Sequence, residues 1–121
     1  MKIFGHPWIA SERFYTISSI NDIKRTPANS ILLLNPLPYS LELAQYCQQN
    51  SIPYALKVNS IKDAVFANLM KCKYIIAEKA LAIELMPIAQ NYLFDTQVLG
   101  KIEDENEIEI MAVAGVDGVI L

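Results

Sequence analysis

The sequence predicts an α/β domain built on a mainly parallel sheet of about five or six strands. Short apolar runs of strand length recur at nearly constant intervals along the chain. Each interval is long enough for one helix and two turns, and a parallel neighbour is reached only through such a crossover. The runs are Ile31–Leu34, Tyr54–Val58, Tyr74–Ala77, Gln97–Gly100 and Gly118–Leu121.

Two architectures fit this regular spacing of apolar runs. The leading one is a three-layer, flavodoxin-like or Rossmann-like domain with helices on both faces of the sheet. The alternative is half of a (βα) barrel. At 121 residues the chain predicts a single domain, residues 1–121. Residues 1–13 are expected to form an edge strand, antiparallel to its neighbour, or an N-terminal extension, because Gly5 and Pro7 interrupt them and proline in a sheet favours an edge.

Helices are expected between the apolar runs. Ser19, Ser40 and Ser60 stand where an N-cap hydroxyl would begin a helix. Phe14–Ile17 adds a strand rich in aromatic and β-branched residues. The expected helices are Ile20–Arg25, Leu41–Gln49, a segment starting after Ser60, Lys79–Leu93 and Asp104–Ala114.

Two of these helices carry specific expectations. Ile61, Ala64, Val65 and Leu69 have the spacing of an apolar stripe that lies on a sheet. Pro87 stands inside Lys79–Leu93 and lacks the N–H group that an interior helix position needs. A bent helix, or two short helices meeting at Pro87, is therefore predicted.

Composition and charge exclude several classes of protein. The chain is 53% hydrophobic with a formal net charge of −3, and no basic cluster exceeds Lys24-Arg25, which argues against nucleic-acid binding. No apolar run is long enough for a membrane span, and the first residues lack the order of a signal peptide, so a cytoplasmic protein is expected. Cys47 and Cys72 are expected as buried, reduced thiols. The apolar excess favours a homodimer.

Chemistry in a parallel sheet is expected at the carboxyl ends of the strands, where ligands bind beside helix N-termini. No glycine-rich phosphate loop follows any strand, which argues against a Rossmann dinucleotide site and against a P-loop, and no cofactor or metal is expected. A small anionic ligand remains the candidate. The candidate ligand-binding residues are Asn35, Lys57, Asn59, Ser60, Glu78, Lys79 and Lys101.

Lys57 and Lys101 occupy matched positions. Shifting the chain by 44 residues superposes the apolar-to-polar boundaries that follow them, and it aligns Ile76 with Ile120. A lysine at a strand end either extends its ammonium to water, binds an anion or acts as an amine nucleophile. The phrase from Lys101 to Ile120 also resembles a βα step of phosphate-binding (βα)8 barrel enzymes.

His6 is the only histidine and the one candidate imidazole base. No nucleophile elbow accompanies it, so His6 is expected in a turn, with Trp8 covering an edge of the core.

Two functions remain open on the sequence. The first is a small cytoplasmic module that acts through self-association or a protein partner. The second is a binder of, or enzyme for, a small anionic metabolite, including phosphorylated ones, at the carboxyl ends of the strands. The sequence does not decide whether the protein is an enzyme.

Overall fold

Seven parallel strands form one sheet in the computed structural model, which describes all residues 1–121. The strand order is β1-β7-β6-β5-β4-β3-β2. The strands are β1 Lys2–Phe4, β2 Arg13–Ile17, β3 Ser30–Leu34, β4 Tyr54–Lys57, β5 Tyr74–Glu78, β6 Gln97–Lys101 and β7 Gly118–Ile120.

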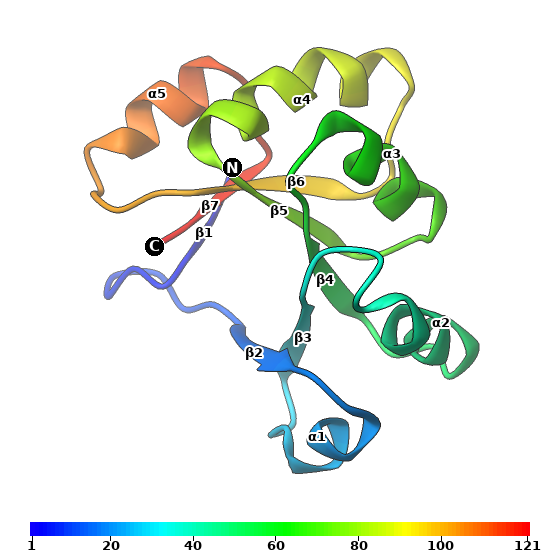
Figure 1. Ribbon diagram of the computed structural model, residues 1–121. Helices are drawn as coiled ribbons and strands as arrows, with labels where there is room; N and C mark the ends of the chain where they lie inside the picture. The colour runs from blue at the N-terminus through cyan, green and yellow to red at the C-terminus, as the bar shows by residue number, and fades with distance from the viewer.

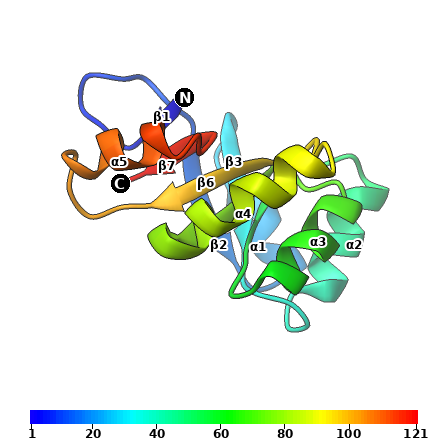
Figure 2. The ribbon, with the colours of Figure 1, turned by 90° about the horizontal axis from the view of Figure 1, so that it is seen from above.

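The sheet is curled into a half-barrel (Figure 1). From β2 to β7 every strand pairs with the next one in the chain. Right-handed crossovers that always step in the same direction place their helices on the same face. The helices accordingly cover the outer, convex side of the sheet, as Figures 1 and 2 show.

The predicted α/β class and parallel sheet are confirmed, with seven strands where about five or six were expected. Of the two architectures, the half-barrel matches. The sequential strand order differs from the doubly wound order, so helices do not cover both faces. The N-terminal residues do form an edge strand, β1, but it pairs with β7 in parallel rather than antiparallel.

The bounds of the helices are α1 Ile20–Arg25, α2 Leu41–Gln49, α3 Ile61–Leu69, α4 Lys79–Asn91 and α5 Glu107–Val113. The three helices predicted from serines each begin directly after the serine, whereas α5 begins at Glu107 rather than at the expected Asp104. The Ser60 hydroxyl accepts a hydrogen bond from the Asp63 amide at 3.1 Å and caps α3. None of the five helices combines the length and the apolar character needed to cross a bilayer.

Pro87 does not divide α4, which runs as one helix from Lys79 to Asn91. Ala82 and Leu85 are buried before the proline and Ala89 after it, so both halves are fixed against the sheet. An interior proline costs about 3 kcal/mol. Burial of the apolar side chains on both sides offsets that cost.

Of the four residues expected to face the sheet from α3, only Ala64 is buried. Ala64 and Ala67 are fully buried, whereas Val65 and Leu69 are exposed. Small side chains let the helix axis approach the sheet closely, and the larger apolar side chains then point to solvent. The exposed apolar residues of α3 are Ile61, Val65, Phe66 and Leu69.

Two apolar clusters lie on the two faces of the sheet. The larger one, with 23 buried residues, fills the space between the strands and the helices. The smaller one lies on the concave face, and at its centre Tyr74 makes edge-to-face contacts with Phe4 and Phe14, at ring-centroid distances of 5.4 and 6.0 Å. Phe4 and Phe14 also touch each other at 5.1 Å.

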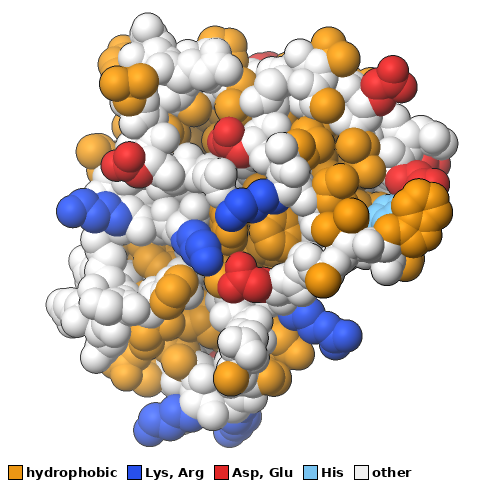
Figure 3. Space-filling view, turned by 180° about the vertical axis from the view of Figure 1, so that it is seen from behind, with side chains coloured by type: hydrophobic (Ala, Val, Ile, Leu, Met, Phe, Trp, Pro, Cys, Tyr) orange, Lys and Arg blue, Asp and Glu red, His pale blue; other side chains and the backbone are white.

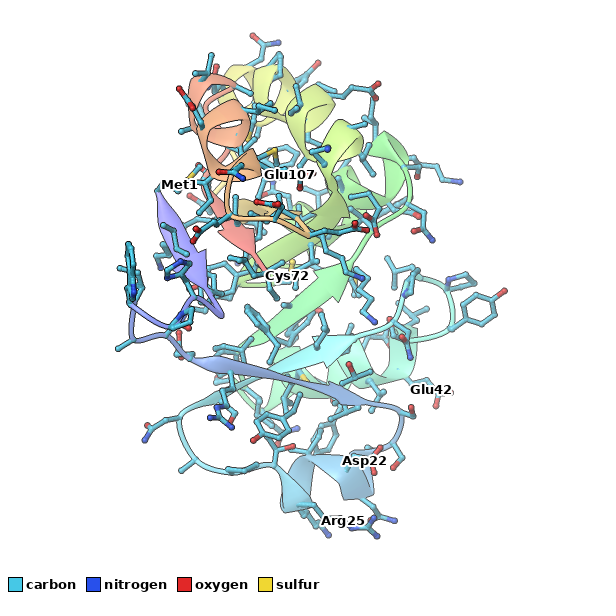
Figure 4. The ribbon with its side chains drawn as sticks, turned by 90° about the vertical axis from the view of Figure 1, so that its left-hand side faces the viewer. Met1, Asp22, Arg25, Glu42, Cys72 and Glu107 are labelled. Atoms are coloured by element: carbon cyan, nitrogen blue, oxygen red, sulfur yellow. The ribbon has the colours of Figure 1, made fainter.

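This aromatic trio joins the two ends of the sheet. Phe4 lies on β1 and Phe14 on β2, which are the edge strands and share no hydrogen-bonded pairing. Figure 4 looks onto this open side, where β1, starting at Met1, and β2, next to Asp22 of α1, lie nearest the viewer. Ring contacts rather than backbone hydrogen bonds therefore hold the two edges together.

Candidate functional site

Three charged side chains extend the concave face at the carboxyl ends of neighbouring strands. Successive residues of a strand point to opposite faces of the sheet. Ala55 and Ile76 belong to the concave cluster, so Lys57 and Glu78, each two residues later, lie on that same face. Lys101 follows Leu99 on β6 in the same way.

These side chains line a pocket of about 240 Å³, which we call the rim pocket. Lys57, Asn59, Glu78 and Lys101 supply its polar groups. Its apolar surface comes from strands on both sides of the curl, since Leu33 lies on β3 and Ile120 on β7. The full lining is Leu33, Pro36, Lys57, Val58, Asn59, Ile76, Ala77, Glu78, Lys101, Ile120 and Leu121.

The charges of the rim pocket are not neutralised in pairs. The molecule has three ion pairs, and none of them includes Lys57, Glu78 or Lys101. Lys57 is half-buried, while Glu78 and Lys101 are exposed. The side chains that line the rim pocket therefore include two ammonium groups and one carboxylate, although the whole chain has a formal net charge of −3.

The register of the strands makes Lys57 and Lys101 equivalent. Lys57 pairs with Ile76 of β5, and Lys101 pairs with Ile120 of β7. These are the residues that the shift of 44 positions aligns in the sequence. The similarity at a shift of 44 residues therefore corresponds to two matching strand pairs in the sheet, β4 with β5 and β6 with β7. In each pair a lysine lies opposite an isoleucine.

The other three candidate residues do not line the pocket. The backbone oxygen of Asn35 accepts the hydroxyl hydrogen of Ser40 at 2.5 Å, which turns the chain into α2. The Ser60 hydroxyl serves as the cap of α3.

Lys79 is engaged elsewhere as well. Its Nζ donates to Glu107 Oε1 at 2.9 Å, which ties the start of α4 to the start of α5. This hydrogen bond raises the pKa of Lys79 and lowers the pKa of Glu107. Lys79 is therefore held in a contact between helices.

The residues that the sequence analysis missed are apolar. Leu33 and Ile120 face the same pocket from strands that are four positions apart in the sheet. The alternation of side chains along each strand predicts which face of the sheet Leu33 and Ile120 lie on. Only the curvature of the sheet brings β3 and β7 close enough to line one pocket. A flat sheet would separate them by roughly 19 Å at about 4.8 Å per strand.

His6 lies in the loop that follows β1 and is fully engaged there. Its Nε2 is 2.6 Å from Glu105 Oε2, and its Nδ1 accepts the amide hydrogen of Trp8 at 3.1 Å. Since Nδ1 is the acceptor, Nε2 carries the proton and donates it to the carboxylate. Both ring nitrogens are thus occupied, so His6 fastens this loop to the loop before α5. In Figure 3 the pale-blue histidine lies next to red acidic side chains at the edge of the molecule.

Trp8 does not cover the core, because 85% of it is exposed. Its ring stands edge-to-face against His6 at 5.1 Å, on the outside of the molecule. The turn predicted for this segment is present, and the expected role of Trp8 is wrong.

A second hollow, of about 830 Å³, lies at the opposite ends of the strands and contains both cysteines in its wall. Cys47 and Cys72 are free and buried, as predicted. Burial raises the pKa of both thiols, that of Cys72 to about 12. The thiolate is the reactive form of cysteine, so these side chains belong to the core rather than to a reactive site.

Fold and site together define an α/β half-barrel with a basic pocket at the carboxyl ends of its strands. No protein-family model matches the chain, and no curated protein matches it.

Proposed function

We propose that the protein binds a small anionic metabolite in the rim pocket. The observation that carries the proposal is the placement of Lys57, Glu78 and Lys101 on three adjacent strands above an apolar floor. In parallel α/β sheets the crevice outside the carboxyl ends of the strands is where ligands bind. Perturbing these three side chains should therefore change binding.

The chemistry of the pocket narrows the ligand. Two ammonium groups without carboxylate partners favour a carboxylate or phosphate. Glu78 supplies an acceptor for a hydroxyl or amine of the same molecule. Drug-sized ligands occupy pockets of about 300–1,000 Å³, so a pocket of 240 Å³ favours a smaller compound.

Binding is tested by following backbone amide resonances during titration with inorganic phosphate and, separately, with pyruvate. We expect the resonances of the β4, β5 and β6 ends to shift in a saturable way. Lys101→Gln should weaken binding about tenfold or more, since a charge-assisted hydrogen bond contributes about 1.5–3 kcal/mol.

Lys62→Gln is the matched control, because Lys62 is an exposed lysine on α3 outside the pocket. It should bind both anions as the wild-type protein does. Equal binding by Lys101→Gln and Lys62→Gln would show that the anions bind elsewhere and would refute the proposal.

A second function, self-association as a homodimer, is favoured by the exposed apolar face of α3. Phe66 and Leu69 are 51% and 69% exposed and lie on one side of the helix. Exposed apolar side chains that adjoin one another are a mark of protein contact sites. Light scattering coupled to gel filtration should then show a dimer that Phe66→Glu dissociates and that Val113→Glu, on α5, leaves intact. A monomeric wild-type protein would exclude this function.

A further inference from the structure

We infer that the side-chain amine of Lys57 forms a reversible imine with a small aldehyde or ketone whose carboxylate or phosphate is held by Lys101. This inference rests on the proposed function, since the rim pocket must first bind the anion. It adds the class of substrate and a covalent step at one atom, Lys57 Nζ.

The surroundings of Lys57 single it out among the lysines. It is half-buried at the end of β4, a strand with neighbours on both sides, and it shares the rim pocket with the apolar Leu33 and Ile76. Lysines that form imines lie in apolar pockets or beside a second cationic group. Lys57 has both kinds of neighbour, because Lys101 lines the same pocket.

Lys57 is also free to react. No carboxylate forms an ion pair with its ammonium group, whereas Lys73 and Lys79 are each paired with a glutamate. Lys101 is the more exposed of the two rim lysines and is the natural holder of the anion, which keeps part of its hydration. The two lysines therefore have different roles.

Glu78 is placed between them. It lies on β5, which separates β4 from β6, and it is level with Lys101 in the register. Lys57 is level with Ile76, two residues before Glu78. Neighbouring strands are about 4.8 Å apart, so Glu78 lies directly beside Lys101 and diagonally across from Lys57, within reach of long side chains, and its carboxylate is suited to accept and return protons.

The step balances without a redox partner. Glu78 accepts a proton from the Lys57 ammonium, and the amine lone pair then attacks the carbonyl carbon. The carbonyl oxygen takes up the proton that Glu78 returns, and the attacking nitrogen, now positively charged, gives one of its protons to the Glu78 carboxylate, which leaves a neutral carbinolamine. Glu78 then donates that proton to the hydroxyl group, which leaves as water while the nitrogen lone pair forms the C=N bond. One lysine ammonium group and one carbonyl thus give one protonated imine and one water molecule, and the Glu78 carboxylate is regenerated.

Borohydride trapping tests this step on the intact protein. The protein is incubated with pyruvate or with dihydroxyacetone phosphate, reduced with sodium borohydride, digested and mapped by mass spectrometry. Hydride addition turns the imine into a stable secondary amine. Because the bound anion holds the carbonyl near the amine, we expect Lys57 to be labelled at least about tenfold more than the exposed Lys62.

Three comparisons sharpen the test. Lys57→Arg should abolish the specific label, and Lys101→Gln should reduce the label on Lys57 several-fold. Acetone, which has a carbonyl but no anionic group, should label Lys57 no more than Lys62. Preferential labelling by only one of the two anionic probes supports the inference and identifies the anion as carboxylate or phosphate.

Equal labelling of Lys57 and Lys62 in the wild-type protein overturns the inference without any variant having to fold. If the amide resonances of the strand ends still shift with phosphate or pyruvate, the proposed binding function stands and only the imine is refuted. If neither labelling nor binding occurs, both are refuted. A label on Lys57 that Lys101→Gln does not reduce also contradicts the assigned roles.

Discussion

Replacing Tyr74 by alanine should be among the most destabilising single changes in this protein. The side chain is 1% exposed at the centre of the concave face and contacts the rings of both edge strands. Truncating a buried aromatic residue to alanine costs about 3–5 kcal/mol. A domain of 121 residues has a total stability of roughly 6–18 kcal/mol, so this loss is a large part of it.

Tyr74→Phe separates the ring from the hydroxyl group. The hydroxyl accepts a hydrogen bond from Lys2 Nζ at 3.0 Å, and Lys2 is exposed, so its ammonium regains water when the bond is lost. We expect Tyr74→Phe to cost no more than about 1 kcal/mol. The difference between the two variants measures the packing of the ring.

Urea denaturation followed by circular dichroism gives both free energies. A double-mutant cycle of Phe4→Leu and Phe14→Leu adds the coupling between the two edge strands, which we expect to be about 0.5–1.5 kcal/mol. The reasoning fails if Tyr74→Ala costs less than about 1 kcal/mol or no more than Tyr74→Phe. A coupling of zero would show that the rings do not hold the edges together.

Three further predictions concern the backbone and the titratable groups. Gly118→Ala should cost about 1–3 kcal/mol in urea denaturation, because its Cβ would lie 2.8 Å from the Lys2 backbone oxygen. Gly115→Ala should cost about 1 kcal/mol, because its φ of +79° is unfavourable for alanine while its Cβ would make only an ordinary contact, 3.7 Å from Gln90 Nε2. The reverse order of the two costs would contradict the register of β1 and β7. The pKa of Cys72 is raised from 9.0 to about 12, so its contribution to the free energy of unfolding is complete below pH 9 and is lost as the pH rises toward 12. Between pH 9 and 10 the wild-type protein should lose about 1 kcal/mol more than Cys72→Ala, and equal losses would refute the burial of the thiol. The pKa of Glu107 is lowered from 4.5, so its contribution to the free energy of unfolding is present above pH 4.5 and is lost as the pH falls through the lower pKa of the folded state. Glu107→Gln should therefore reduce the loss of stability in acid, measured by urea denaturation at several pH values. An unchanged loss would contradict the pair with Lys79.

Local elements were the most predictable part of the fold. The helices Ile20–Arg25 and Leu41–Gln49 have the predicted bounds, because caps and prolines act over a few residues. The side of α3 that meets the sheet was not predictable from its stripe. The apolar spacing suggested Ala64, Val65 and Leu69, but the short distance between helix and sheet admits only small side chains, so Ala64 and Ala67 are buried there while Val65 and Leu69 are exposed.

The sequence predicted that the candidate site lies at the carboxyl ends of the strands, but it did not predict which side chains contact one another there. Lys57 and Lys101 were found from their places at strand ends, and both line the rim pocket. Lys79 has a similar place in the sequence, yet it pairs with Glu107, 28 residues away. Such a pairing depends on how two helices lie beside each other, which no local pattern records.

The sequence by itself determined that the sheet is parallel and where its strands end, because crossover spacing and apolar runs are properties of short segments. Only the tertiary structure decided that the second face of the strands is covered by the sheet's own curl rather than by helices. A strand buried on both faces reads as a continuous apolar run in either case. The choice depends on strand order and on contacts such as Phe4 with Phe14, between segments that no hydrogen-bonded pairing joins.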